Sequence, residues 1–80
     1  MDIQERAYFI AGRVYQHMLI NINKNSIEWG VAQYGDKDKD YKLAFQVGEI
    51  IKDMYWRYFN NLGFKIEERP YGYSLHITWE

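Results

Sequence analysis

The sequence predicts an α+β fold: two long amphipathic helices with a short segment between them, then a C-terminal antiparallel β-hairpin packed on the helices. Two patterns carry this prediction. Apolar residues recur every three or four positions over about 3–22 and 38–62, and every second position over about 64–68 and 73–79. With 80 residues, one Pro and six Gly, the chain shows no linker, so we expect a single domain, 1–80, with a thin core.

The first helix is predicted over about 3–22. Asp2 is placed to cap it, Glu5 is the acidic half of a capping box, and Asn21 marks its end. Phe9 does not fit the apolar stripe, because its ring points to the polar side of the helix. The stripe itself consists of Ile3, Ala7, Ile10, Ala11, Val14 and Met18.

The segment 26–34 is compatible with two structures. Ser26 as a cap and Gly35 as a terminator would frame a short helix, with Glu28 in its first turn. Apolar residues also alternate here as in a strand: Ile27, Trp29 and Val31. We favour a short helix over a strand for this segment.

The second helix is predicted over about 38–62. Aspartates precede it, which suits the positive end of the helix dipole, and Gly63 follows it in a position for the left-handed conformation. Phe45 and Trp56 lie about three turns apart on a face that points away from the apolar stripe and is shared with polar residues. The stripe consists of Leu43, Val47, Ile50, Ile51, Met54, Tyr58 and Leu62.

The hairpin is indicated by a change of period after Gly63. Between its strands, Pro70 fixes one φ of the turn and Gly72 allows a positive one. The residues expected to face the helices are Phe64, Ile66, Leu75, Ile77 and Trp79. A two-stranded hairpin is marginal alone, so it must pack on the helices, gain a third strand from 26–34 or pair with a second chain, and the last option predicts a homodimer.

Composition limits the partners. The net charge of −1 provides no global field to attract nucleic acid or an acidic membrane, and no run of apolar residues is long enough to span a bilayer. The chain has no cysteine and begins with polar and acidic residues where a signal peptide would be basic and then apolar. We therefore expect a cytoplasmic protein that does not bind membranes.

Catalytic patterns are weak. His17 and His76 are the only histidines, and neither has a carboxylate or a second ligand at a recognisable spacing. Ser26 and Ser74 are the only serines, and neither lies in a nucleophile-elbow turn. We therefore expect no catalytic residue and no enzyme activity.

Metal and phosphate motifs are also incomplete. Asp36, Asp38 and Asp40 have the spacing that opens a calcium loop, but Tyr41 stands where that loop needs glycine and Val47 where it needs glutamate. We interpret the three aspartates as a solvated entrance to the helix. Glycine-rich phosphate cradles are absent from the sequence, so no metal or cofactor is expected.

Aromatic residues supply the functional prediction. They make up 19% of the chain, more than one small core needs, and the excess rings are suited to recognition. We expect a small non-enzymatic interaction protein, such as an inhibitor, adaptor or assembly factor, that binds a protein partner. The candidate partner-binding residues are Phe9, Phe45, Trp56, Arg57, Arg69 and Tyr71.

Two further expectations concern the partner. The short chain, the lack of cysteine and the abundance of Asn, Ile, Lys and Tyr are similar to small accessory proteins of bacteriophages and mobile elements, which implies action on a host enzyme or a defence system. The alternative function is binding of a nucleotide or single-stranded nucleic acid at a dimer interface. There the rings would stack on bases, and Lys52, Arg57 or Arg69 would meet phosphate.

Overall fold

Helix α1 (Ile3–Ile20) opens the fold in the computed structural model, which describes all 80 residues. The Asp2 carboxylate accepts a hydrogen bond from the Glu5 N–H at 2.8 Å, so the predicted cap is confirmed. The helix ends at Ile20 with Asn21 as its C-cap, slightly earlier than predicted, and a 3₁₀ turn (Ile22–Lys24) follows. Its buried residues are Ala7, Ile10, Ala11, Val14 and Met18, all members of the predicted stripe.

Residues Ser26–Val31 form strand β1, so the favoured prediction of a short helix at 26–34 is wrong. Ile27 and Val31 are buried and Trp29 is half-buried, as the alternating pattern requires. Both structures place apolar residues on one side, and the choice depends on a pairing partner that is far along the chain. Gly35, with a φ of 65°, does not end a helix but lies in the connection to the next one.

Helix α2 (Lys37–Tyr55) is shorter than the predicted 38–62. After Tyr55 the chain turns irregularly, which buries Phe59 and Leu62 but leaves Tyr58 72% exposed. The left-handed residue before the next strand is Asn61, with a φ of 53°, and not Gly63 as predicted. The buried residues of α2 are Asp40, Leu43, Ala44, Val47, Gly48 and Ile51.

Strands β2 (Gly63–Arg69) and β3 (Gly72–Thr78) form the predicted hairpin. Strand β3 also pairs with β1, giving an antiparallel three-stranded sheet of order β1–β3–β2. The third strand therefore comes from the same chain, which removes the need for a second chain to support the hairpin. Gly72 has no positive φ, contrary to expectation; a Cβ there would lie only 2.4 Å from the Val31 carbonyl oxygen.

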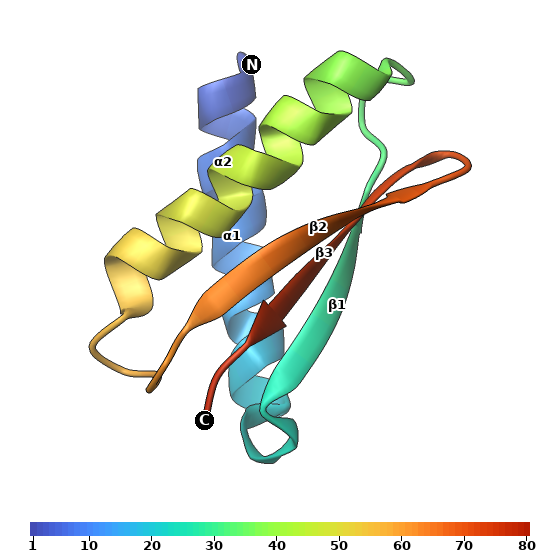
Figure 1. Cartoon of the computed structure of the whole chain (residues 1–80). Coiled ribbons are helices and arrows are strands. Elements are labelled where there is room, and N and C mark those ends of the chain that lie inside the picture. Colours follow the sequence, from blue (N-terminus) through green and yellow to red (C-terminus); the bar gives the residue numbers. More distant parts are fainter.

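Both helices cover one face of the sheet, and the other face is open (Figure 1). The core lies between the helices and the covered face, and includes Leu75, Ile77 and Trp79 of the hairpin as expected. Phe64 and Ile66 are only partly buried at its margin. Neither helix is apolar enough over a sufficient length to cross a membrane. The fold thus presents the helix surfaces, the open sheet face and the outer edges of β1 and β2 to its surroundings.

Candidate interaction surfaces

The four rings that the sequence places outside the core are exposed in the structure. The exposed fractions are 56% for Phe9, 43% for Phe45, 59% for Trp56 and 88% for Tyr71. Phe9 lies on α1, Phe45 on α2, Trp56 directly after α2, and Tyr71 at the tip of the hairpin. The core does not require these rings, whereas their binding to a partner stays a prediction.

Phe45 belongs to a connected group of rings over α2, β2 and β3. It is stacked beside Tyr41 with ring centroids 6.5 Å apart, and it meets Phe64 edge to face at 6.0 Å. Tyr41 in turn meets Tyr73 at 5.4 Å. Gly48 allows this approach, because a Cβ there would lie 2.5 Å from the Phe64 ring. We call Tyr41, Phe45, Phe64 and Tyr73 the aromatic patch. Phe45 thus points away from the stripe as predicted, but it leans on β2 and is not isolated on a polar face.

The end of α2 carries two different aromatic arrangements. The Arg57 guanidinium lies 5.1 Å from the centroid of the Trp56 ring, a cation–π contact between two predicted partner-binding residues. Tyr55 instead stacks on Tyr15 of α1, with centroids 3.8 Å apart, and burial followed by the neighbouring Tyr15 raises the pKa of Tyr55. Tyr55 is therefore engaged within the fold, whereas Trp56, Arg57 and the exposed Tyr58 are available to a partner here.

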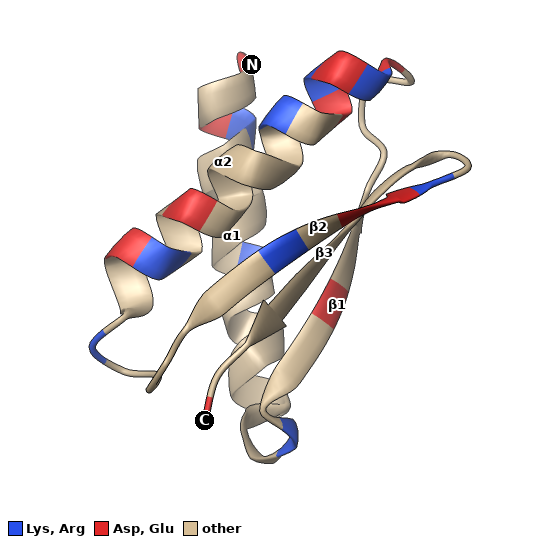
Figure 2. Ribbon diagram, viewed as in Figure 1, with Lys and Arg blue, Asp and Glu red and all other residues tan.

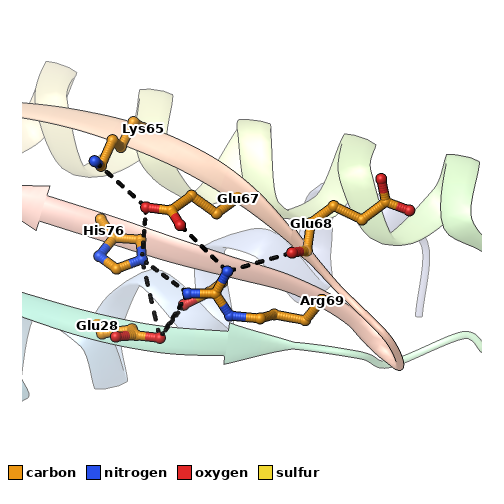
Figure 3. A network of polar contacts seen from close by, with 7 residues as sticks. Glu28, Lys65, Glu67, Glu68, Arg69 and His76 are labelled. Carbon is orange, nitrogen blue, oxygen red and sulfur yellow. Dashed lines mark hydrogen bonds and ion pairs between the residues drawn. The ribbon is translucent and has the colours of Figure 1, made fainter.

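A network of charged side chains joins the three strands on the open face of the sheet (Figure 3). Ser74 Oγ donates to Glu28 Oε1 at 2.6 Å, and Arg69 Nη2 lies 3.5 Å from the same oxygen. Arg69 Nη1 lies 3.2 Å from Glu67 Oε2, and His76 Nε2 lies 3.3 Å from Glu67 Oε1. The sequence shows no carboxylate at a recognisable spacing from His76, but the fold places Glu67 beside it. Strand register, which spacing along the chain does not reveal, brings these groups together.

The two carboxylates of the network are held in their ionised form. The hydrogen bond from Ser74 lowers the pKa of Glu28. Burial opposes this shift, and the neighbouring His76 and Arg69 add to the lowering. The hydrogen bonds from Arg69 and then Lys65 lower the pKa of Glu67. Figure 2 shows acidic and basic residues following one another along β2 and the hairpin. This face is therefore electrostatically paired within the molecule.

An open hollow of about 470 Å³ lies beside the network near the hairpin tip. Gly30 of β1 contributes to this hollow because it has no side chain, and no atom lies within 4 Å of the position that its Cβ would take. Arg69 and Tyr71, two of the predicted binding residues, line it together with Glu28 and Ser74. The structure therefore brings Arg69 and Tyr71 to one place, on the side of β1 that faces away from the helices.

A second hollow, of about 340 Å³, lies between α1 and β1 on the helix side of the sheet. We call it the α1–β1 groove; it is lined by Arg6, Phe9, Ile10, Arg13, Trp29 and Gln33. Arg6 Nη1 donates to Gln33 Oε1 at 3.0 Å, while Arg6 Nε is buried without a hydrogen-bond partner. The Arg13 guanidinium lies 5.9 Å from the centroid of the Phe9 ring. Two cations and two aromatic residues thus line one groove.

The aspartates before α2 have structural roles. Asp36 accepts from the Lys39 N–H at 3.2 Å and caps the helix. Asp40 is 1% exposed, and its Oδ1 accepts from the N–H groups of Gln33 and Tyr34, each at 2.9 Å. The expectation of a solvated entrance is therefore wrong for Asp40. No three His, Asp or Glu side chains gather in a way that could hold a metal ion.

The predicted binding residues are only partly gathered: Arg69 with Tyr71, and Trp56 with Arg57. Sequence reasoning missed Tyr41, Tyr73 and Trp29. Tyr41 had a visible signal, because it precedes Phe45 by one helical turn, whereas the other two gain these neighbours through the packing of the helices on the sheet. Comparison of the chain with protein-family models, with curated proteins and with solved structures gives no match.

Proposed function

We propose that this protein is a non-enzymatic interaction protein that binds a protein partner through exposed aromatic side chains, chiefly those of the aromatic patch. The observation that carries the proposal is that Tyr41 and Phe45 remain 47% and 43% exposed although they pack against Phe64 and Tyr73. Rings fixed on a helix and a sheet lose little conformational entropy on binding, and one such anchor can contribute about 2 kcal/mol or more.

The surroundings of the aromatic patch support the same function. Lys37 Nζ lies 5.0 Å from the centroid of the Tyr73 ring and 3.2 Å from Glu68 Oε2, so charged groups lie next to the rings. Protein interfaces commonly combine an aromatic centre with a polar rim of this kind. The proposed surface therefore has both parts of an interface.

The charged network on the open sheet face is less suited to catalysis than to a structural role. Both Glu28 and Glu67 have a lowered pKa and already accept hydrogen bonds. A general acid or base acting near neutral pH works best when its own pKa is near that pH. The network therefore fits a role in ordering the three strands.

The test is affinity capture from a lysate of the source organism with the wild-type protein and two variants. We expect Tyr41→Ala/Phe45→Ala to reduce recovery of the partner at least tenfold. Tyr8→Ala is the matched control, because Tyr8 is 54% exposed on α1, away from the patch. Circular dichroism checks that each variant is folded. A partner recovered equally by wild type and double variant would refute the proposed surface. Given the composition, host enzymes and defence proteins are the first partners to examine.

A further inference from the structure

Strand β1 has one edge with no neighbour. It pairs only with β3, and Ser26, Glu28 and Gly30 are exposed. The Trp79 N–H donates to the Asn25 carbonyl at 3.0 Å. Hydrogen-bonded pairs alternate with non-bonded pairs in an antiparallel ladder, so Ile27, Trp29 and Val31 exchange hydrogen bonds with β3. The N–H and C=O groups of Glu28 and Gly30 therefore point away from the sheet. Neither proline nor lysine, the usual protections of an edge, occurs in β1.

The α1–β1 groove runs beside this edge and carries positive charge without an internal counter-charge. Neither Arg6 nor Arg13 takes part in an ion pair, whereas Arg69 and Lys37 do. Arg6 is held toward the groove by Gln33, whose own backbone is fixed by buried Asp40. This arrangement therefore exists in the absence of a ligand, and the unpaired positive charge of the two arginines favours binding of an anion.

We propose that the edge of β1 accepts an extended acidic segment of the partner protein as a fourth strand. The backbone groups of Glu28 and Gly30 pair with the segment, and its carboxylates enter the α1–β1 groove beside Arg6 and Arg13. Addition of a strand to a sheet edge gives affinity through the main chain and specificity through alternate side chains. This inference rests on the proposed function, because the segment belongs to the protein partner.

The two sides of β1 define a sequence pattern for the segment. Side chains on the helix side meet the arginines, so acidic residues are favoured at every second position. The intervening side chains lie on the open face near Glu28, where a further carboxylate is repelled, and near Gly30, where the hollow leaves room. The segment therefore alternates acidic residues with uncharged ones.

Two other ligands fit the edge of β1 and the α1–β1 groove less well than an acidic peptide does. A second copy of the chain pairing through β1 would bring Arg6 and Arg13 toward the same residues of its partner, and like charges oppose this contact. A nucleotide would use the rings and arginines of the groove but would leave the backbone of Gly30 unpaired. The free edge and the groove together favour a peptide.

The probe is a fluorescein-labelled heptapeptide that alternates glutamate with threonine, with fluorescence anisotropy as the measurement. We expect saturable binding that weakens with salt, and no binding of the peptide in which lysine replaces glutamate. N-methylation of the alternate peptide N–H groups that face β1 is expected to weaken binding at least tenfold, because it removes main-chain donors without changing charge.

Variants of the protein test the edge and the groove separately. Gly30→Pro removes an N–H that β3 does not use, so the sheet should persist while affinity falls at least fivefold; Gly30→Ala, whose Cβ meets no atom within 4 Å, should bind like wild type. Arg13→Ala and Arg6→Ala are each expected to weaken binding at least fivefold. Lys42→Ala/Lys52→Ala, on α2, is the charge control.

The outcomes are distinct. Equal affinity of Gly30→Pro and Gly30→Ala, or equal binding of the acidic and basic peptides, would overturn the inference. Quenching of tryptophan fluorescence by adenosine monophosphate that is insensitive to Gly30→Pro would overturn it in favour of a nucleotide, and a dimer abolished by Gly30→Pro would do so in favour of self-pairing. If the peptide fails while Tyr41→Ala/Phe45→Ala still abolishes capture, the inference fails and the proposed function stands.

Discussion

Asp40 is the residue on which the connection between β1 and α2 depends. It lies in the first turn of α2, yet its side chain turns inward and accepts two backbone N–H groups of the preceding loop. Because one of those groups belongs to Gln33, the same carboxylate helps to position Arg6. A single buried charge therefore links the start of a helix to the α1–β1 groove.

We expect Asp40→Ala to lower the free energy of unfolding by about 1–3 kcal/mol, because two partly buried N–H groups lose their acceptor. In a domain of this size each kcal/mol lowers Tm by roughly 4–8 °C. Thermal unfolding followed by circular dichroism measures the change. Asp38→Ala, exposed on the same turn, is the control. If both variants melted at the same temperature, water would be replacing the carboxylate and Asp40 would not hold the loop.

At the scale of elements, local sequence predicted the two helices and the hairpin because their signals lie within each segment. The cap at Asp2, the helix periods and the turn at Pro70 need no knowledge of distant residues. Strand β1 is different. Its residues suit a short helix as well as a strand, and β3, far along the chain, decides the outcome.

The end of α2 was mispredicted for a related reason. The apolar stripe continues past Tyr55, so the pattern extends the helix to about 62. In the structure Phe59 leaves the helical path and packs edge to face against Tyr15 at 6.3 Å and Trp79 at 5.3 Å. Burial of one large ring against α1 and the end of the sheet therefore outweighs continuation of the helix.

The charged network on the open sheet face makes the stability of the protein depend on pH. The lowered pKa of Glu28 and Glu67 means that their stabilisation is complete above the usual value of 4.5 and is lost as pH falls through the lower folded values. We expect Tm to be steady from neutral pH to about 5 and to fall in more acidic buffer. Glu28→Gln should reduce the fall, whereas Glu49→Gln, which removes an exposed carboxylate without an ion pair, should not. Identical acid profiles for wild type and Glu28→Gln would contradict the role of Glu28.

At the scale of the whole molecule, the candidate surfaces were only partly predictable. Exposure of Phe9, Phe45 and Trp56 followed from helix geometry, because a side chain opposite the apolar stripe has no core to enter. The aromatic patch and the α1–β1 groove each combine residues from distant elements. Their composition depends on how the elements pack, which no single segment of the sequence records.

The boundary between core and surface is tested by two tryptophans. Trp79 is 5% exposed, and its Nε1 donates to the Ile22 carbonyl at 3.2 Å, whereas Trp56 is 59% exposed. We expect Trp79→Ala to cost about 3–5 kcal/mol, as for other large buried rings. Trp56→Ala should leave Tm nearly unchanged. Chemical denaturation measures both, and a loss of several degrees for Trp56→Ala would place that ring in the core and remove it from the proposed surface.

The central position of β3 has a consequence for synthesis of the protein. Both ladders of the sheet include β3, and contacts such as that between Ser74 and Glu28 join residues 46 positions apart. While the ribosome is still making β3, β1 and β2 have no strand to pair with, and the helices have no sheet to cover. Contacts this distant in sequence slow folding, so the apolar residues that face the sheet stay uncovered until β3 emerges.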